Sequence, residues 1–117
     1  MLGPQTLLLA RYLDLLTARQ KVAATNIANA DTPGYRTRDV DFQFALDEAL
    51  RGSNLEPPGP LATHQVGGLA VKNDGNDVSL ERELGATSEA AIRFGLASLL
   101  LRGNLQAVRQ AIREGRS

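Results

Sequence analysis

The spacing of apolar residues in the last third of the chain constrains its fold more than any other feature. From residue 80 to residue 112, apolar or small side chains recur at alternating steps of four and three, which places them on one face of a helix. Ser79 is placed to cap this helix, and Glu81 and Glu83 fall in its first turn, where the helix dipole favours acidic groups. The large apolar members of the series, called here the C-terminal seam, are Leu80, Leu84, Phe94, Leu101, Leu105, Val108 and Ile112.

A second helix is predicted from Gln5 to about Ala30, because the same spacing recurs there. Pro4 suits the first turn of such a helix, where its missing N–H needs no partner. The apolar members of the N-terminal seam are Leu9, Leu13, Leu16 and Ile27. A further apolar stripe lies beside that seam and is formed by Leu8, Tyr12, Leu15 and Val22. The helix therefore has more apolar surface than one packing partner covers.

The segment between these helices has a different character. Residues 42–50 predict a short amphipathic helix, with Asp41 or Asp39 as its cap and Gly52 as its stop. Residues 53–78 hold three Pro and four Gly, a composition that no helix tolerates. We expect a loop there, with at most a short strand at residues 69–72.

These elements predict a mainly α fold in which long N- and C-terminal helices pair as a coiled-coil-like hairpin around a short irregular middle segment. We expect residues 1–30, 31–78 and 79–117 to form one domain together. Burying the C-terminal seam contributes at most about 10–20 kcal/mol. Ordering a helix of roughly 35 residues costs about 1–2 kcal/mol for each backbone unit. The hairpin alone cannot offset that cost, so the chain is expected to be a subunit that its neighbours complete.

Charge is spread unevenly along the chain. It has 13 basic and 13 acidic residues, but residues 31–92 carry an excess of acidic groups and the two ends an excess of basic groups. Oppositely charged segments can meet within one molecule or between neighbours. A nucleic-acid partner is not expected, because the net charge is zero and the arginines of the C-terminal helix form no single dense stripe.

Residues that could carry chemistry are few. The chain has no Cys and a single histidine, His64, in the predicted loop, which favours a polar surface residue over a catalyst. Asp39 and Asp41 have the spacing of paired carboxylates, but helix capping and local ion pairing explain them better. The stretch "NDGND" at residues 73–77 lacks the ligand spacing of a calcium loop and reads as a turn. We expect no catalysis, cofactor, metal or small-molecule substrate.

The first residues do not resemble a secretory signal. Their longest apolar run, residues 7–10, ends at Arg11, whereas a signal needs roughly 7–15 apolar residues. No uninterrupted run approaches the roughly 18–20 residues that span a membrane. We therefore expect neither a cleaved signal peptide nor a membrane helix.

The stretch "NIANADTPGYRTRDVDF" at residues 26–42 resembles the N-terminal signature of the flagellar axial protein family. The residues that match are Asn26, Ile27, Ala28, Asn29, Ala30, Asp31, Thr32, Pro33, Gly34, Tyr35, Arg38, Asp39, Val40, Asp41 and Phe42. Asp74, Gly75 and Asn76 match the segment that leads into the family's C-terminal helix, and Thr63 with His64 fits a weaker position. The sequence departs from the family at Ser79, Ser88 and Phe94.

The resemblance implies a structural subunit of the proximal rod in the bacterial flagellar basal body. It also implies polymerisation through the terminal helices, type III export without a cleaved signal peptide, and a place in the periplasm. Its partners would be copies of itself, other rod proteins and the adaptor at the inner-membrane ring. The short chain fits the family's two short rod proteins, and "RTRDVDF" favours one of them. The alternatives are the other short rod protein and a small helical binding or regulatory module.

The motif also has a physical interpretation. Thr32 precedes proline and is driven out of the helical region, so the first helix must end before it. Pro33 and Gly34 suit the central positions of a type II turn, in which glycine supplies the positive φ. We therefore expect the motif to impose one sharp exit from the N-terminal helix.

Overall fold

A computed structural model describes residues 3–51 and 61–115 of the chain. Its helices are α1 (Pro4–Ala28), α2 (Phe42–Leu50) and α3 (Leu80–Gly115), and its strands are β1 (Arg38–Val40) and β2 (Thr63–Gln65). The molecule is elongated, measuring 70 × 26 × 18 Å. Two long terminal helices and a short irregular middle confirm the predicted fold class. Gly52 and the part of the predicted loop at residues 53–60 lie outside the described residues.

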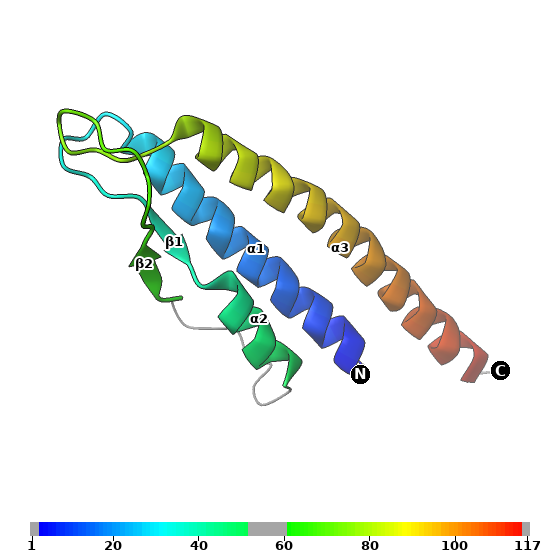
Figure 1. Ribbon diagram of the computed structural model, residues 1–117. Coiled ribbons are helices and arrows are strands. Elements are labelled where there is room, and N and C mark those ends of the chain that lie inside the picture. The colour runs from blue at the N-terminus through cyan, green and yellow to red at the C-terminus, as the bar shows by residue number, and fades with distance from the viewer. Residues whose placement is uncertain (1–2, 52–60, 116–117) are drawn as a thin grey trace.

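The three helices lie side by side in one row (Figure 1). α1 is in the middle and contacts both α2 and α3. α1 and α3 run antiparallel, so the end of α1 lies beside the start of α3, and α3 continues past the first residue of α1 (Figure 1). The row therefore has two outer edges, one formed by α2 and the other by α3.

Local sequence explains where the helices begin and end. Pro4 occupies the first position of α1, and the helix ends at Ala28, two residues before the predicted end. Asp41 caps α2 by accepting a hydrogen bond from the Phe44 backbone N–H, at 3.2 Å. Ser79 caps α3, because its hydroxyl accepts a hydrogen bond from the Arg82 N–H at 3.2 Å.

The predicted strand at residues 69–72 is wrong, and the strand lies at Thr63–Gln65 instead. β2 pairs antiparallel with β1, placing Arg38 opposite Gln65 and Val40 opposite Thr63. The Arg38 guanidinium also donates to the Thr63 hydroxyl and carbonyl oxygens, both at 2.8 Å. These side-chain bonds select the partner of β1, and a search for apolar runs could not detect them.

The contact between α1 and α3 has a register that differs from the predicted C-terminal seam. The buried side chains of α3 are Glu83, Ala90 and Ala97, which recur every seven residues. Leu80, Leu84, Phe94 and Ile112 are 49%, 58%, 36% and 46% exposed, and Leu101, Leu105 and Val108 are half-buried. The register shifts because alanine allows a close helix approach and because hydrogen bonding draws Glu83 inward. On α1, the seam residue Leu16 is buried, and Leu9, Leu13 and Ile27 are half-buried.

The apolar core is small and sits where α1, β1 and the start of α2 meet α3. Its buried members are Leu15, Leu16, Val40, Phe42 and Ala90. The Phe42 ring makes an edge-on contact with Tyr12, with ring centroids 5.9 Å apart, and the Arg19 guanidinium lies 5.5 Å from the Phe42 centroid on its face. This core anchors one side of α1 and leaves much of α3 uncovered.

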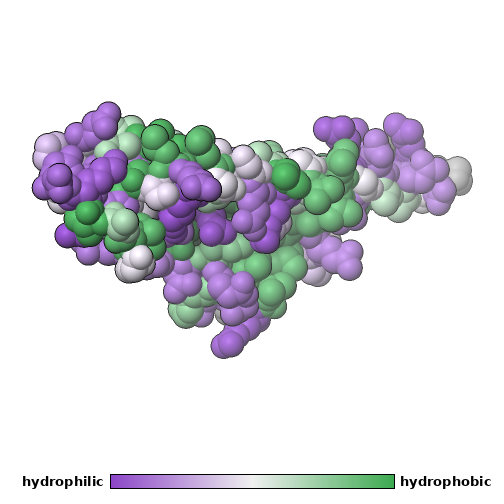
Figure 2. All heavy atoms as spheres, turned by 45° about the horizontal axis from the view of Figure 1, so that its top comes forward, coloured by the Kyte–Doolittle hydropathy of each residue, from purple (hydrophilic) through white to green (hydrophobic). Residues whose placement is uncertain are grey.

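The middle of α3 carries large apolar side chains that the other described residues leave exposed. Ile92, Leu96, Leu99 and Leu100 are each between 60% and 66% exposed. Figure 2 shows hydrophobic surface in the middle of the molecule and hydrophilic surface at its two ends. Contrary to the sequence expectation, α3 is apolar and long enough, by length and composition alone, to cross a membrane. Only 11% of its 18-residue apolar stretch is buried. The expectation rested on apolar runs without a charged residue, whereas this stretch of α3 contains the ion pair of Glu89 and Arg93.

Candidate assembly site

The signature residues gather where α1 ends and α3 begins. We call this cluster the joint; its central members are Asn26, Tyr35, Arg38, Asn76, Asp77 and Glu83. Asn26 is 1% exposed, and its side-chain amide donates to the Arg38 carbonyl at 2.8 Å and to Glu83 Oε1 at 3.0 Å. Its Oδ1 accepts from the Tyr35 hydroxyl at 2.8 Å and from the Arg38 N–H at 3.2 Å. One side chain thus connects α1, β1, the turn and α3.

A pair of salt bridges extends the joint to the start of α3. Arg82 contacts Glu83 Oε1 at 2.6 Å and Asp39 Oδ2 at 2.9 Å. Glu83 is 1% exposed and therefore needs both Arg82 and Asn26 as partners. Because Asp39 belongs to β1, these contacts fix the first turn of α3 against the chain that leaves α1.

Asn76 ties the two loops together. It is 0% exposed, and its side-chain amide donates to the carbonyl oxygens of Asn29 and Thr32, both at 2.8 Å. Its Oδ1 accepts from the Val78 N–H at 2.8 Å. The loop before α3 is thereby fastened to the loop after α1 through two carbonyl oxygens that also accept turn hydrogen bonds, from the Thr32 and Tyr35 N–H groups.

Two glycine turns pack directly against each other beside Asn76. Gly34 has φ +77°, and the Tyr35 N–H donates to the Thr32 carbonyl at 3.2 Å, which confirms the predicted type II turn. Gly75 has φ +85°, and the Gly34 N–H donates to the Asp74 carbonyl at 2.8 Å. A Cβ atom on Gly75 would lie 3.3 Å from the Gly34 Cα, whereas one on Gly34 would meet no atom within 4 Å.

Burial and charge shift two pKa values in the joint. Burial alone raises the pKa of Asp77, but hydrogen bonds from Thr37 and the charge of Arg36 outweigh it, so the pKa of Asp77 is lowered from 3.8. Burial, followed by the negative charge of Glu83, raises the pKa of Tyr35 from 10.0. At neutral pH the joint therefore holds a charged Asp77 and a neutral Tyr35 hydroxyl.

The ionisation of Asp77 should make the free energy of unfolding depend on pH. A carboxyl group whose pKa is lower in the folded state contributes stability that is present above its unfolded pKa and is lost as the pH falls through the folded pKa. The Asp77→Asn variant lacks this contribution, so it should be less stable than the wild-type chain at pH 6 and approach it at pH 3. Urea unfolding, monitored by circular dichroism, measures the free energy of unfolding of each chain at the two pH values. The exposed Asp14→Asn variant is the control, and an equal difference at both pH values contradicts the assignment.

Several predicted residues lie outside the joint. Asp41 caps α2, and Phe42 belongs to the apolar core. Ile27 is half-buried, while Ala28 and Pro33 are exposed. Conversely, the burial of Glu83 was not predicted from the sequence, although Glu83 lies in the family-like stretch 74–83 and in the first turn of α3, and the contacts of Thr37 and Arg82 were not predicted either. Glu83, Ala90 and Ala97 follow one another at intervals of seven residues, and this spacing could have identified Glu83 as part of the buried face of α3.

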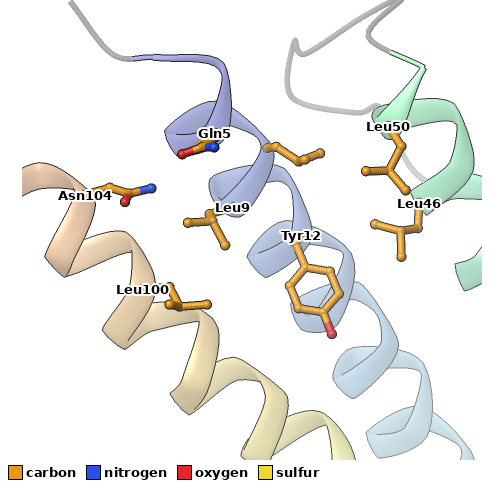
Figure 3. Close-up of a pocket in the computed structure, with 8 residues that line it drawn as sticks. Gln5, Leu9, Tyr12, Leu46, Leu50, Leu100 and Asn104 are labelled. Carbon is orange, nitrogen blue, oxygen red and sulfur yellow. The ribbon is translucent and has the colours of Figure 1, made fainter.

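An apolar groove lies far from the joint, between the amino end of α1, α2 and α3. Its volume is about 440 Å³. It is lined by Gln5, Leu8, Leu9, Tyr12, Leu46, Leu50, Leu100 and Asn104 (Figure 3). Among the residues that the structure describes, the lining contains no carboxylate, histidine or lysine, so it offers apolar contact rather than acid–base chemistry.

The side chains considered for catalysis have structural contacts. Asp39 pairs with Arg82, Asp41 caps α2, and His64 is exposed on β2. Across residues 3–51 and 61–115, no group of three or more His, Asp or Glu side chains is placed to hold a metal ion. The arrangement serves to hold two long helices at one angle.

Comparisons with known proteins give the same family as the signature. The family described as flagella basal body rod protein matches residues 13–36. The chain is 30% identical to the flagellar basal body rod protein FlgB of Escherichia coli and 29% identical to that of Salmonella typhimurium, with 88% of each chain covered in both cases. It is 36% identical to FlgB of Borrelia hermsii over 63% of this chain and 70% of that protein. The other short rod protein, FlgC, is not favoured, and the chain belongs to the FlgB family of flagellar basal body rod proteins.

Proposed function

We propose that this chain is a structural subunit of the proximal flagellar rod that polymerises by packing its terminal helices against those of neighbouring subunits. The observation that carries the proposal is the uncovered apolar surface of α3, where Ile92, Leu96 and Leu99 are each at least 60% exposed. Exposed apolar patches of this kind on a soluble chain mark protein contacts. Subunit packing would bury this surface and add to the stability of the helices.

The partners follow from the same proposal. They are copies of this chain, other rod proteins, the adaptor at the inner-membrane ring and the flagellar type III export apparatus. Export by that route needs no cleaved signal peptide and delivers the subunit to the periplasm. Residues 1–30, 31–78 and 79–117 act as one domain, in which the joint sets the angle between the two terminal segments. No catalysis, nucleic acid or small molecule takes part.

The proposal is tested by replacing the natural copy in the source bacterium. A strain that lacks the gene should be non-motile, and the wild-type chain supplied in trans should restore motility. The chain should then be recovered in purified basal bodies. If motility returns while the chain is absent from basal bodies, the structural role is wrong.

A seam variant tests whether the helices themselves make the assembly contacts. Leu105 is a half-buried apolar residue of α3, and Leu105→Asp places a charge in the proposed dry contact, at a cost of about 3 kcal/mol. We expect this variant to be produced and exported but not incorporated, leaving the cells non-motile. The exposed Ala111→Asp adds the same charge to the same helix and should swim. Normal motility with Leu105→Asp would show that the seam is no assembly contact.

A further inference from the structure

A second stripe with the four-three spacing runs along α3 on the side away from α1. We call it the outer stripe; its members are Leu84, Ser88, Ala91, Gly95, Leu99, Arg102, Gln106, Arg109 and Arg113. All of them are exposed, whereas the buried side chains Glu83, Ala90 and Ala97 lie on the opposite side of the helix. This spacing is the one with which a helix packs along a partner helix.

The two halves of the outer stripe differ in chemistry. The first half is apolar or small, and its Leu84 and Leu99 are 58% and 62% exposed. The second half carries Arg102, Arg109 and Arg113, none of which forms an ion pair within the described residues. The surface that covers this stripe must therefore combine an apolar anchor with acidic side chains.

The outer face of α2 has that combination. Phe42 and Ala49 are buried on the side of α2 that packs on the rest of the chain, and Phe44 lies on the other side with 62% of its surface exposed. Glu48 is also exposed and follows Phe44 by one helical turn, so both project from the same face. Asp41, exposed at the start of α2, adds a second carboxylate beside Phe44.

The helices that carry these surfaces, α2 and α3, lie at opposite edges of the row, with α1 between them (Figure 1). On α2, the side chains of Phe44 and Glu48 border a cavity that Arg11 of α1 also lines. We infer that the outer face of α2 in one copy docks on the outer stripe of α3 in a second copy, with Phe44 against the apolar half and Glu48 facing the arginines. The inference rests on the proposed function, because it names a further contact, beside the packing of terminal helices, between copies of this chain. Phe44 supplies the apolar area, and the charges set orientation and register.

This contact has a consequence for the form of the assembly. It joins two different surfaces, so a pair of copies keeps one free α2 edge and one free α3 edge. Such heterologous contacts propagate and generate a closed ring or a helix, whereas a contact between identical surfaces stops at a dimer. The row of helices would then become the repeating unit around an axis.

A charge swap tests the contact in cells that carry the variant as their only copy. Glu48→Arg and Arg102→Glu should each lower the amount of chain in purified basal bodies by about tenfold, because like charges then face each other. The double variant should recover to within about threefold of the wild-type amount. Asp14→Lys, a reversal of an exposed acid on α1, is the matched control. Circular dichroism of each purified variant verifies that it folds.

Wild-type incorporation of both single variants, or a double variant no better than the singles, overturns this contact. Neither result affects the proposed function, which fails only if the wild-type chain itself is absent from basal bodies. Crosslinking is a second measurement, since the chain has no cysteine. A chain with both Glu48→Cys and Gln106→Cys should give a ladder of crosslinked species after oxidation in assembled rods. Products no larger than a dimer overturn the heterologous contact.

Discussion

Replacing Asn26 by alanine should lower the stability of the chain by about 3 kcal/mol, because four hydrogen bonds end on this one buried side chain. The loss leaves the buried carboxylate of Glu83 with Arg82 alone and leaves the Tyr35 hydroxyl without its acceptor. In a chain of this size the midpoint of thermal unfolding should fall by about 10 °C. Calorimetry of the purified protein measures this shift.

Asn29→Ala is the matched control for that measurement. Asn29 belongs to the same motif, but its side-chain hydrogen bonds to Thr25 and Thr32 are exposed to solvent. We expect Asn29→Ala to lower the midpoint of thermal unfolding far less than Asn26→Ala does. Equal shifts for the two variants would mean that burial of Asn26 is not what stabilises the joint.

The second large effect should come from the glycine turns. Gly34→Val and Gly75→Val both force a β-branched residue into positive φ, which is strongly disfavoured. Gly75→Val should be the worse of the two, because its Cβ would also press on the Gly34 backbone at 3.3 Å. We expect both to block incorporation into the rod, and Gly75→Val also to reduce the helix content of the purified chain.

Asparagine separates backbone conformation from steric contact at these turns. Gly34→Asn should support motility, since asparagine tolerates the left-handed conformation and no atom lies within 4 Å of its Cβ. Gly75→Asn should remain defective because of the contact with Gly34. Motility assays with all four variants measure the pattern. If Val and Asn behave alike at position 34, the turn merely ends α1 and does not direct the chain after it.

Periodic features of the fold were predictable from local sequence. The four-three spacing predicted both long helices, and Pro4 and Ser79 marked where α1 and α3 begin. The cap of α2 was narrowed to Asp41 or Asp39, and the structure has Asp41. The turn at Pro33 and Gly34 was also predictable, because proline restricts the preceding residue and only glycine adopts the required φ without strain. Each of these rests on interactions within a few residues of the chain.

The predicted strand is wrong, and the face of α3 that is buried within one chain differs from the predicted C-terminal seam, for a common reason. β2 lies at Thr63 because the Arg38 side chain binds there, and α3 is rotated because Asn26 draws the buried Glu83 inward. Both depend on polar pairs that are distant in sequence. Apolar spacing alone predicts that large leucines such as Leu80 and Leu84 lie in the interior, whereas in the structure they are 49% and 58% exposed.

The sequence by itself determined the helices and the glycine turn of this protein, and its family. Helix spacing, caps and turn residues act locally, and the signature from Asn26 to Phe42 is a contiguous string. Only the tertiary structure decided that Asn26, Asn76 and Glu83 meet in one buried joint, and which face of α3 is left for a neighbour. Those outcomes depend on how the hydrogen-bonding capacity of buried polar groups is satisfied across the fold, since an unpaired one costs more free energy than an exposed leucine.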